Sequence, residues 1–327
     1  NMKKVALVVM VAVLSIVVLF VDHTHVGSAG AVGFKPSPTP WPTPTFVSQW
    51  GTFGSGDGQF ASPKGIAVGK NNKVYVTETS NQGAYEVSNT RVQAFTRTGE
   101  FLFKWGTLGD APGQFSIPKG VAVDNHGHVY VADDFAHNKV QVFSGEGQFL
   151  ANWDYFSKPL GVAAARDGIY VADSDRIQKF DFKGNFILKW GSYGFNEGQF
   201  NFPTDVAVAP DGSVYVLDGS NNLQKFTTDG KFLWRVGFIP PYGADASSEP
   251  GYFSNPQGIG VDTKGNVYVA DTGNHRVEIF SPSGKFLQQF GSQGINPGQF
   301  TSPVDVAVDR SNFIYVIDGA RVQRFAQ

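Results

Sequence analysis

Residues 255–291, NPQGIGVDTKGNVYVADTGNHRVEIFSPSGKFLQQFG, decide the fold. Turn-forming residues divide this stretch into four segments rich in β-branched and aromatic residues, which we expect to be strands: Gly258–Asp262, Asn266–Asp271, Arg276–Phe280 and Lys285–Phe290. The apolar residues of Val267–Ala270 are consecutive, so both faces of the second strand would be buried. A four-stranded sheet that is covered on both faces is expected to stack on copies of itself.

Copies of this unit recur along the chain. The tyrosine of its Val-Tyr-Val segment appears six times, at spacings of 40 to 55 residues: Tyr75, Tyr130, Tyr170, Tyr215, Tyr268 and Tyr315. A proline precedes the first strand of each copy: Pro63, Pro118, Pro159, Pro203, Pro256 and Pro303. A repeat of this length with four strands is typical of a propeller blade. The sequence therefore predicts an all-β fold of six four-stranded antiparallel blades.

The two ends of the repeat region complement each other. Phe46–Gly51 matches the fourth strand of other repeats, such as Phe101–Gly106, but no first three strands precede it. The sixth repeat has the opposite defect, because it ends at Gln327 after its third strand. We therefore predict that the N-terminal strand completes the last blade and closes the ring, which makes residues 46–327 one propeller domain.

At Asn274–Val277 (NHRV) the chain resembles the NHL-repeat family, and the resemblance extends over about residues 46–325. The resemblance implies a six-bladed propeller. It leaves the function open, because such propellers serve as enzymes, sensors and scaffolds. NHL-like propellers include amidating lyases, and related six-bladed propellers include metal-dependent lactonases. A lyase of that kind would hold zinc with several histidines.

The N-terminal residues indicate a location outside the cytoplasm. Lys3 and Lys4 precede Val5–Val21, an apolar run expected to form one hydrophobic helix with its charged start in the cytoplasm. Residues 1–29 are therefore either a membrane anchor or a signal peptide, and the protein would be secreted if they are cleaved. Residues 30–45 are rich in proline and are expected to form an extended linker.

The composition excludes several functions. The chain has a net charge of −2, and this weakly acidic balance argues against binding of nucleic acid, which needs a concentrated basic surface. It contains no cysteine, so disulfides, thiol catalysis and thiolate metal sites are excluded. No Ser-His-Asp arrangement, phosphate-binding loop or haem motif is evident.

Features that recur in most blades are expected to be structural. A Gly-Gln-Phe segment precedes four of the six repeats, and we expect its phenylalanine to pack between blades: Phe60, Phe115, Phe200 and Phe300. An acid follows every second strand: Glu78, Asp133, Asp173, Asp218, Asp271 and Asp318. A base begins five of the six third strands: Arg91, Lys139, Arg176, Arg276 and Arg321. These charges predict local surface ion pairs of small individual energy, or carboxylates that accept backbone N–H bonds.

Functional residues are expected where the repeat is broken on the face that carries the entrances to the first strands. Asp205 and Asp305 replace the glycine found in the other four blades, and Lys64 and Lys119 occupy the neighbouring position in blades one and two. Long insertions occur at Thr79–Thr90 and Phe238–Pro250. Tyr85, Ile239 and Tyr242 in these loops are predicted to be apolar anchors for a partner. Ile239 and Tyr242 would otherwise fold down and cover their own blade.

Two functions compete. The first is a binding scaffold that contacts a protein or an extracellular polymer through this face. The second is a metal-dependent enzyme of the lyase or lactonase type with its site at the channel mouth. His126 and His128 are expected on the opposite face, so no set of three histidines forms on one face. No cofactor is predicted, although Asp205 and Asp305 would suit Ca²⁺ or Mg²⁺. These two residues would otherwise accept hydrogen bonds from local backbone N–H groups.

Overall fold

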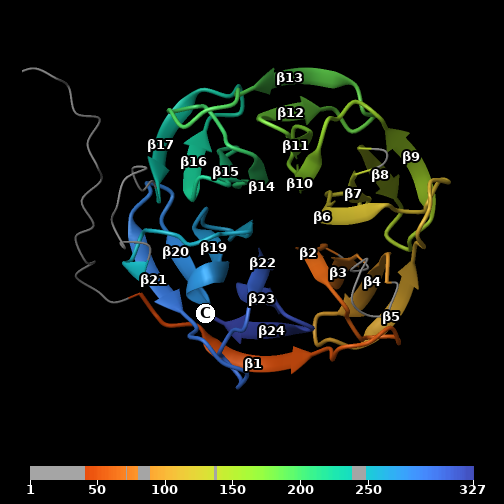
Figure 1. The fold of residues 1–327 in the computed structure, drawn as a ribbon, viewed down its shortest axis with the longest axis horizontal. Coiled ribbons are helices and arrows are strands. Elements are labelled where there is room, and N and C mark those ends of the chain that lie inside the picture. The colour runs from red at the N-terminus through yellow and green to blue at the C-terminus, as the bar shows by residue number, and fades with distance from the viewer. Residues whose placement is uncertain (1–40, 71, 80–88, 136–137, 238–247) are drawn as a thin grey trace, which may run out of the picture. The chain divides into compact units, whose positions relative to one another are not determined.

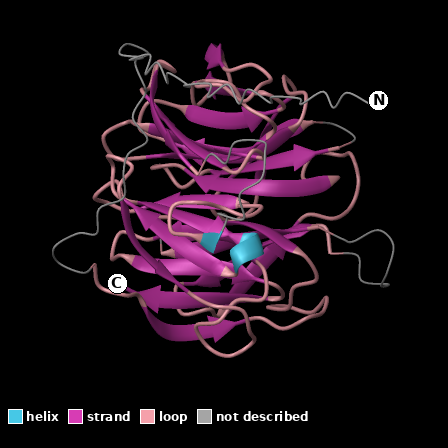
Figure 2. Ribbon diagram, turned by 60° about the vertical axis from the view of Figure 1, so that its left-hand side comes forward, coloured by secondary structure: helices cyan, strands magenta, loops and turns pink. Residues whose placement is uncertain are grey.

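A computed structural model describes residues 41–70, 72–79, 89–135, 138–237 and 248–327. The predicted hydrophobic helix and the predicted linker up to residue 40 lie outside the described residues. Within the described ranges, no helix has the length and apolar character needed to cross a membrane. Short 3₁₀ turns, such as η2 (Thr272–Asn274), are the helical structure in this part of the chain, as Figure 2 shows.

The strands form six four-stranded antiparallel sheets. Blade one comprises β2 (Pro63–Val68), β3 (Lys73–Glu78), β4 (Arg91–Thr96) and β5 (Phe101–Trp105). Blade two comprises β6 (Ile117–Val123), β7 (Val129–Asp134), β8 (Lys139–Phe143) and β9 (Phe149–Trp153). Blade three comprises β10 (Pro159–Ala164), β11 (Ile169–Asp173), β12 (Arg176–Phe180) and β13 (Phe186–Trp190).

The second half of the chain repeats this order. Blade four comprises β14 (Pro203–Val208), β15 (Val214–Asp218), β16 (Asn222–Phe226) and β17 (Phe232–Val236). Blade five comprises β18 (Gly258–Val261), β19 (Val267–Asp271), β20 (Arg276–Phe280) and β21 (Phe286–Phe290). Blade six comprises β22 (Pro303–Val308), β23 (Phe313–Asp318), β24 (Arg321–Ala326) and β1 (Thr45–Trp50).

The N-terminal strand closes the ring, as the sequence predicts. β1 pairs antiparallel with β24, from Thr45 opposite Ala326 to Trp50 opposite Val322. This pairing covers an edge of β24 that would otherwise present unpaired backbone groups. Trp41, just before β1, packs against the core between blades five and six. The chain is therefore fixed to the propeller from Trp41 onward.

The inner strands β2, β6, β10, β14, β18 and β22 contact one another in this order, and β22 returns to β2 (Figure 1). The hydrophobic core lies between neighbouring sheets. For example, Phe60 and Phe95 of blade one, with ring centroids 5.6 Å apart, share a cluster with Tyr315 of blade six. The predicted role of the Gly-Gln-Phe phenylalanines between blades is thereby confirmed. Because each blade buries its faces against two neighbours, the near-continuous apolar second strands have no solvent-facing side.

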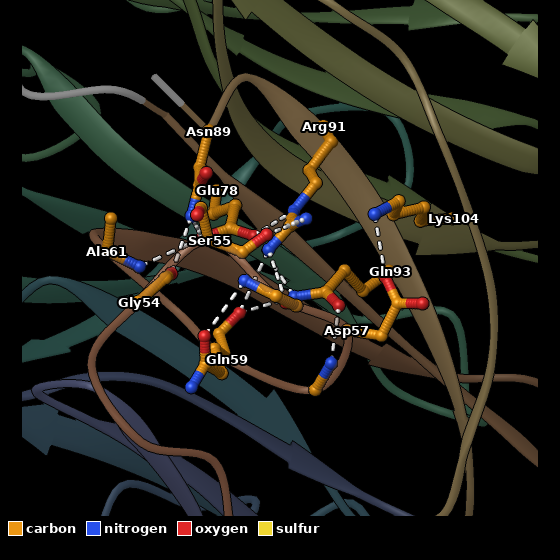
Figure 3. A network of polar contacts seen from close by, with 12 residues as sticks. Gly54, Ser55, Asp57, Gln59, Ala61, Glu78, Asn89, Arg91, Gln93 and Lys104 are labelled. Atoms are coloured by element: carbon orange, nitrogen blue, oxygen red, sulfur yellow. Dashed lines mark hydrogen bonds and ion pairs between the residues drawn. The ribbon is translucent and has the colours of Figure 1, made fainter. Parts of the chain in front are cut away.

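In four blades the repeated acid pairs with the base of the same blade, but the prediction that these pairs lie on the surface is wrong. In blade one, Arg91 Nε lies 2.5 Å from Glu78 Oε1, and the two side chains are only 7% and 0% exposed (Figure 3). Glu78 also accepts hydrogen bonds from Gln93 Nε2 at 3.0 Å and from the Ala61 backbone N–H at 3.0 Å. Burial raises the pKa of Glu78, although these hydrogen bonds and Arg91 oppose the shift.

The pairs are buried because a loop from the preceding repeat covers them. Arg91 donates hydrogen bonds to the backbone carbonyls of Ser55, Gly56 and Gln59, which fixes this loop over the ion pair (Figure 3). Similar pairs occur in other blades: Asp173 with Arg176 at 3.0 Å, Asp271 with Arg276 at 2.8 Å and Asp318 with Arg321 at 2.8 Å. Since removing one partner of a buried pair leaves an uncompensated charge, these networks fix the loops firmly to their blades.

Candidate functional site

The inner strands approach one another most closely at one position of the repeat. This position is glycine in four blades, and a Cβ atom added at Gly65 would lie 2.5 Å from the carbonyl oxygen of Lys119 in blade two. A Cβ added at Gly258 would lie 2.2 Å from Asp305 Oδ1 of blade six. Close backbone approach therefore requires glycine at these two positions. The other two blades carry Asp205 and Asp305 here, as the sequence indicates.

The carboxylates of Asp205 and Asp305 join neighbouring blades. Asp305 Oδ1 accepts a hydrogen bond from the N–H of Val306 at 2.7 Å, and Oδ2 accepts one from the N–H of Ile66 in blade one at 2.8 Å. Asp205 joins blade four to blade five in the same way. Its Oδ2 accepts a hydrogen bond from the N–H of Ile259 in blade five at 2.9 Å, and its Oδ1 accepts one from the N–H of Val206. Each aspartate therefore has the backbone-binding role that the sequence offered as the alternative to a ligand site.

The environment of these two aspartates disfavours their charged forms. Burial raises the pKa of Asp205 to about 7, against the effect of the hydrogen bonds from Ile259 and Val206. Burial also raises the pKa of Asp305 well above its usual range, and repulsion from Asp205 raises it further. Both oxygens of each carboxyl group already accept an N–H, so neither residue presents an unengaged oxygen to a cation. A Ca²⁺ or Mg²⁺ site here stays a prediction.

Lys64 and Lys119 lie half-buried at the entrances of β2 and β6. Burial lowers the pKa of Lys64, and the charge of Lys119 lowers it further. Burial also lowers the pKa of Lys119, where attraction to Asp134 opposes the shift and repulsion from Lys158 adds to it. Within the described ranges, neither ammonium group forms an ion pair. The mouth of blades one to three therefore concentrates positive charge that no ion pair neutralises within the part of the chain that the structure describes.

Exposed aromatic residues flank this positive charge, and they were not predicted. Phe135 follows β7 and is 71% exposed, Tyr155 precedes β10 and is 68% exposed, and Phe202 precedes β14 and is 49% exposed. Phe135 and Phe202 have φ values of 82° and 55°, which are uncommon for bulky residues. Lys158 Nζ lies 5.2 Å from the ring centroid of Phe202. Because these side chains interrupt no motif, only the structure shows that they lie together on the mouth face, which is the face that carries the entrances to the first strands.

The predicted anchors Tyr85, Ile239 and Tyr242 lie outside the described residues, so their positions remain predictions. The larger parts of the two long insertions, residues 80–88 and 238–247, share this status.

The opposite face holds a cavity of about 850 Å³ that was not predicted. It is lined by the turns between the first and second strands of all six blades. Its charged lining residues include acids and bases in similar number: Lys70, Arg97, Asp124, Arg166, Asp167, Asp211, Asp262, Asp309 and Arg310. One turn at this cavity, in blade two, brings Asp124, His126 and His128 together, with one ligand atom of each within 4.8 Å of the others. The prediction that the two histidines face away from the mouth is consistent with this position, but a search for three histidines overlooks a set completed by an aspartate.

The comparisons with known proteins identify the repeat. The NHL repeat model matches residues 115–143, 200–224 and 253–280, which fall in blades two, four and five. NHL repeat-containing protein 3 of Homo sapiens is 29% identical over 49% of this chain and 50% of that protein. Peptidyl-glycine alpha-amidating monooxygenase of Mus musculus is 24% identical over 51% of this chain and 24% of that protein.

Solved structures resemble the whole propeller. A streptogramin B lyase aligns with a TM-score of 0.58 and 12% identity, over 86% of this chain and 97% of that chain, which shows a shared fold. The chain spans about half the length, or less, of the curated relatives it matches. Three matched repeats and six closed four-stranded blades together show that this chain is an NHL-repeat β-propeller.

Proposed function

We propose that this propeller is a binding module that works outside the cytoplasm, held at a membrane by residues 1–29. Its partner is a protein with an acidic segment, which docks on the mouth face. The N-terminal sequence supports the location, because Lys3 and Lys4 precede an apolar run long enough to span a bilayer. The propeller fold supports binding in general, since its loops present one continuous face.

One observation at the mouth supports a partner that is acidic. Lys64 and Lys119 are half-buried cations with lowered pKa values and no ion pair within the described part of the chain. A carboxylate placed between them would restore a favourable environment for both charges. Burial raises the pKa of Asp205 to about 7 and also raises the pKa of Asp305, so it reduces the negative charge with which these carboxyl groups could compensate the two lysines.

The exposed aromatic side chains add a second type of contact. Phe135, Tyr155 and Phe202 surround the entrances of blades two to four, and aromatic residues are enriched at the centres of protein interfaces. Protein partners offer both carboxylates and apolar side chains for such a surface. We further propose that Tyr85 and Tyr242 extend this apolar contact from the two long insertions.

The alternative of a metal-dependent enzyme at the channel mouth has less support. Its predicted ligands, Asp205 and Asp305, have both carboxyl oxygens engaged by backbone N–H groups. The relatives that carry enzyme names are at most 28% identical over the matched parts of the chain. We therefore place the binding function first.

The test uses a fluorescent octaglutamate peptide and the purified chain. We expect saturable binding that weakens as salt is raised, because the proposed contacts are partly exposed charges. Lys64→Met with Lys119→Met should reduce the affinity at least about tenfold, since two charged contacts are lost. Lys231→Met, an exposed lysine in the β16–β17 connection on the opposite face, is the matched control and should change nothing.

Two outcomes would contradict the proposal. Equal peptide binding by the wild type and the double variant would remove the mouth as the docking site. Binding of an anionic polysaccharide but not of the peptide would replace the protein partner with an extracellular polymer.

A further inference from the structure

The turn between β6 and β7 has a conserved geometry within the chain but an unusual composition. Its sequence is Asp124-Asn125-His126-Gly127-His128, and Asp124 Oδ1 accepts hydrogen bonds from the backbone N–H groups of His126 at 2.7 Å and His128 at 2.9 Å. In blade five, Asp262 makes the same pair of bonds to the second and fourth residues after it, Lys264 and Asn266. The aspartate alone therefore defines this turn.

The two histidines are not required for the turn. Asn266 Nδ2 donates to Asp262 Oδ2 at 2.7 Å, which is the position that His128 Nδ1 takes beside Asp124 Oδ2 at 2.9 Å. An asparagine would therefore satisfy the geometry. His126 has a side chain that is 68% exposed and occupies the position of Lys264. Its ring contacts Phe182, with centroids 5.9 Å apart, but the turn itself does not require an imidazole there.

The three side chains have the spacing of metal ligands. His128 Nδ1 lies 2.9 Å from Asp124 Oδ2, and His126 Nδ1 lies 3.7 Å from the same oxygen. Zinc binds imidazole nitrogen and carboxylate oxygen at about 2.0–2.2 Å, so tetrahedral ligands are about 3.4 Å apart. The two measured distances lie on either side of this value. Small rotations of exposed imidazole rings would bring all three atoms to one ion.

We propose that Asp124, His126 and His128 form a binding site for a divalent transition-metal ion, with zinc as the expected occupant. Two imidazoles and a carboxylate suit zinc, and three protein ligands leave a fourth position for water or for a ligand in the adjoining cavity. The ion would occupy the position of the hydrogen between His128 Nδ1 and Asp124 Oδ2, and the neutral imidazole would then carry its hydrogen on Nε2.

The surroundings of Asp124 prepare it for this role. Its side chain is fully buried, and the Tyr130 hydroxyl donates to Oδ2 at 3.1 Å while the two turn N–H groups hold Oδ1. Outer contacts of this kind orient a metal ligand. Burial opposes ionisation, but the hydrogen bonds from His128 and His126 outweigh it and lower the pKa of Asp124. The histidine rings, 44% and 68% exposed, leave an entry path from solvent.

The experiment is a zinc titration of the untagged full chain by isothermal titration calorimetry, with the bound metal counted by mass spectrometry after dialysis. We expect one zinc per chain. His128→Asn keeps the hydrogen bond that Asn266 makes in blade five, so it should fold normally. Loss of one of three ligands should weaken zinc binding by at least about tenfold, and His126→Asn should do the same.

Control variants separate this site from the other histidines. His275→Asn removes a partly buried imidazole on the mouth face, and the left-handed φ of 53° at this position suits asparagine. His23→Asn with His25→Asn removes the second His-x-His sequence of the chain. Zinc affinity should be unchanged in both controls. The proposal is overturned if the wild type binds no zinc, if His126→Asn with His128→Asn binds it as well as the wild type, or if the change at 23 and 25 abolishes binding.

Discussion

Glu278 offers a sharp test of how this propeller is stabilised. Five blades have glutamine at its position in the third strand: Gln93, Gln141, Gln178, Gln224 and Gln323. Gln323 shows the pattern, because Oε1 accepts from the N–H of Gly298 at 2.9 Å and Nε2 donates to the carbonyl of Gln299 at 2.6 Å. Glu278 accepts from the N–H of Gly251 at 3.2 Å and lies 3.1 Å from Arg276. The charged form of Glu278 cannot make the donor half of the pattern.

The raised pKa of Glu278 determines the sign and the size of its effect on the free energy of unfolding. Burial raises the pKa of Glu278 from 4.5 to about 8, although Arg276 opposes the shift. Between these two pH values the folded state holds a proton that the unfolded state has lost. Stability is therefore lost as pH rises from about 4.5 to 8 and changes no further above it. A shift of this size corresponds to about 4–5 kcal/mol at most, and we expect about 2–3 kcal/mol because the surrounding groups and water relax around the charged carboxylate.

The assay is urea unfolding of the wild type and Glu278→Gln between pH 5 and pH 9. The variant should match the wild type within about 1 kcal/mol at pH 5 and exceed its stability by about 2–3 kcal/mol at pH 9. Gln323→Glu is the reciprocal variant and should acquire the pH dependence that Glu278→Gln loses. A constant difference between wild type and Glu278→Gln across this range would refute the reasoning, because it would show that Glu278 keeps an ordinary pKa.

Three further predictions concern ring closure and the mouth. Deletion of residues 45–50 removes β1 and leaves β24 unpaired, so the melting temperature should fall by about 10 °C or more; an unchanged melting curve would exclude this closure. Asp305→Ala leaves the N–H groups of Ile66 and Val306 without their acceptor and should destabilise the fold by about 2–3 kcal/mol at pH 7, measured by urea unfolding, whereas a loss below about 0.5 kcal/mol would contradict the bridging role. Octaglutamate binding should weaken as pH rises from 6 to 9 in fluorescence titrations, because Asp205 gains negative charge around pH 7; tighter binding at pH 9 would argue against the proposed mouth.

The sequence predicts the propeller well because each repeat specifies both the strands within a blade and the apolar faces that stack on the neighbouring blades. The Val-Tyr-Val strands are apolar on both faces, which only stacking between blades can satisfy. Closure by Phe46–Gly51 is also predictable, since a fourth strand without its blade pairs with a blade that lacks one. Neither inference needs the position of any individual side chain.

The candidate site was less predictable because its chemistry depends on distances between blades. The replacement of glycine by Asp305 is visible in the sequence, but the N–H of Ile66 that its carboxylate binds is 239 residues away. The burial of Glu78 with Arg91 depends on a covering loop, so the position of these charges at the ends of strands does not predict it. The His126 and His128 pair lacked a visible third ligand, because Asp124 looks like an ordinary turn residue.

A repeat protein separates structural from functional residues by comparison within one chain. Where Asn266 performs the structural task of His128, the imidazole needs another explanation. The same comparison argues against Asp305 as a ligand, since a complete set of backbone partners accounts for its carboxylate. The comparison supports a binding role for Lys64, because its half-buried charge has no ion pair in the described part of the chain. Departures from the repeat therefore indicate function only when the blade itself leaves them unexplained, and Lys64, His126 and His128 meet that condition on opposite faces of the ring.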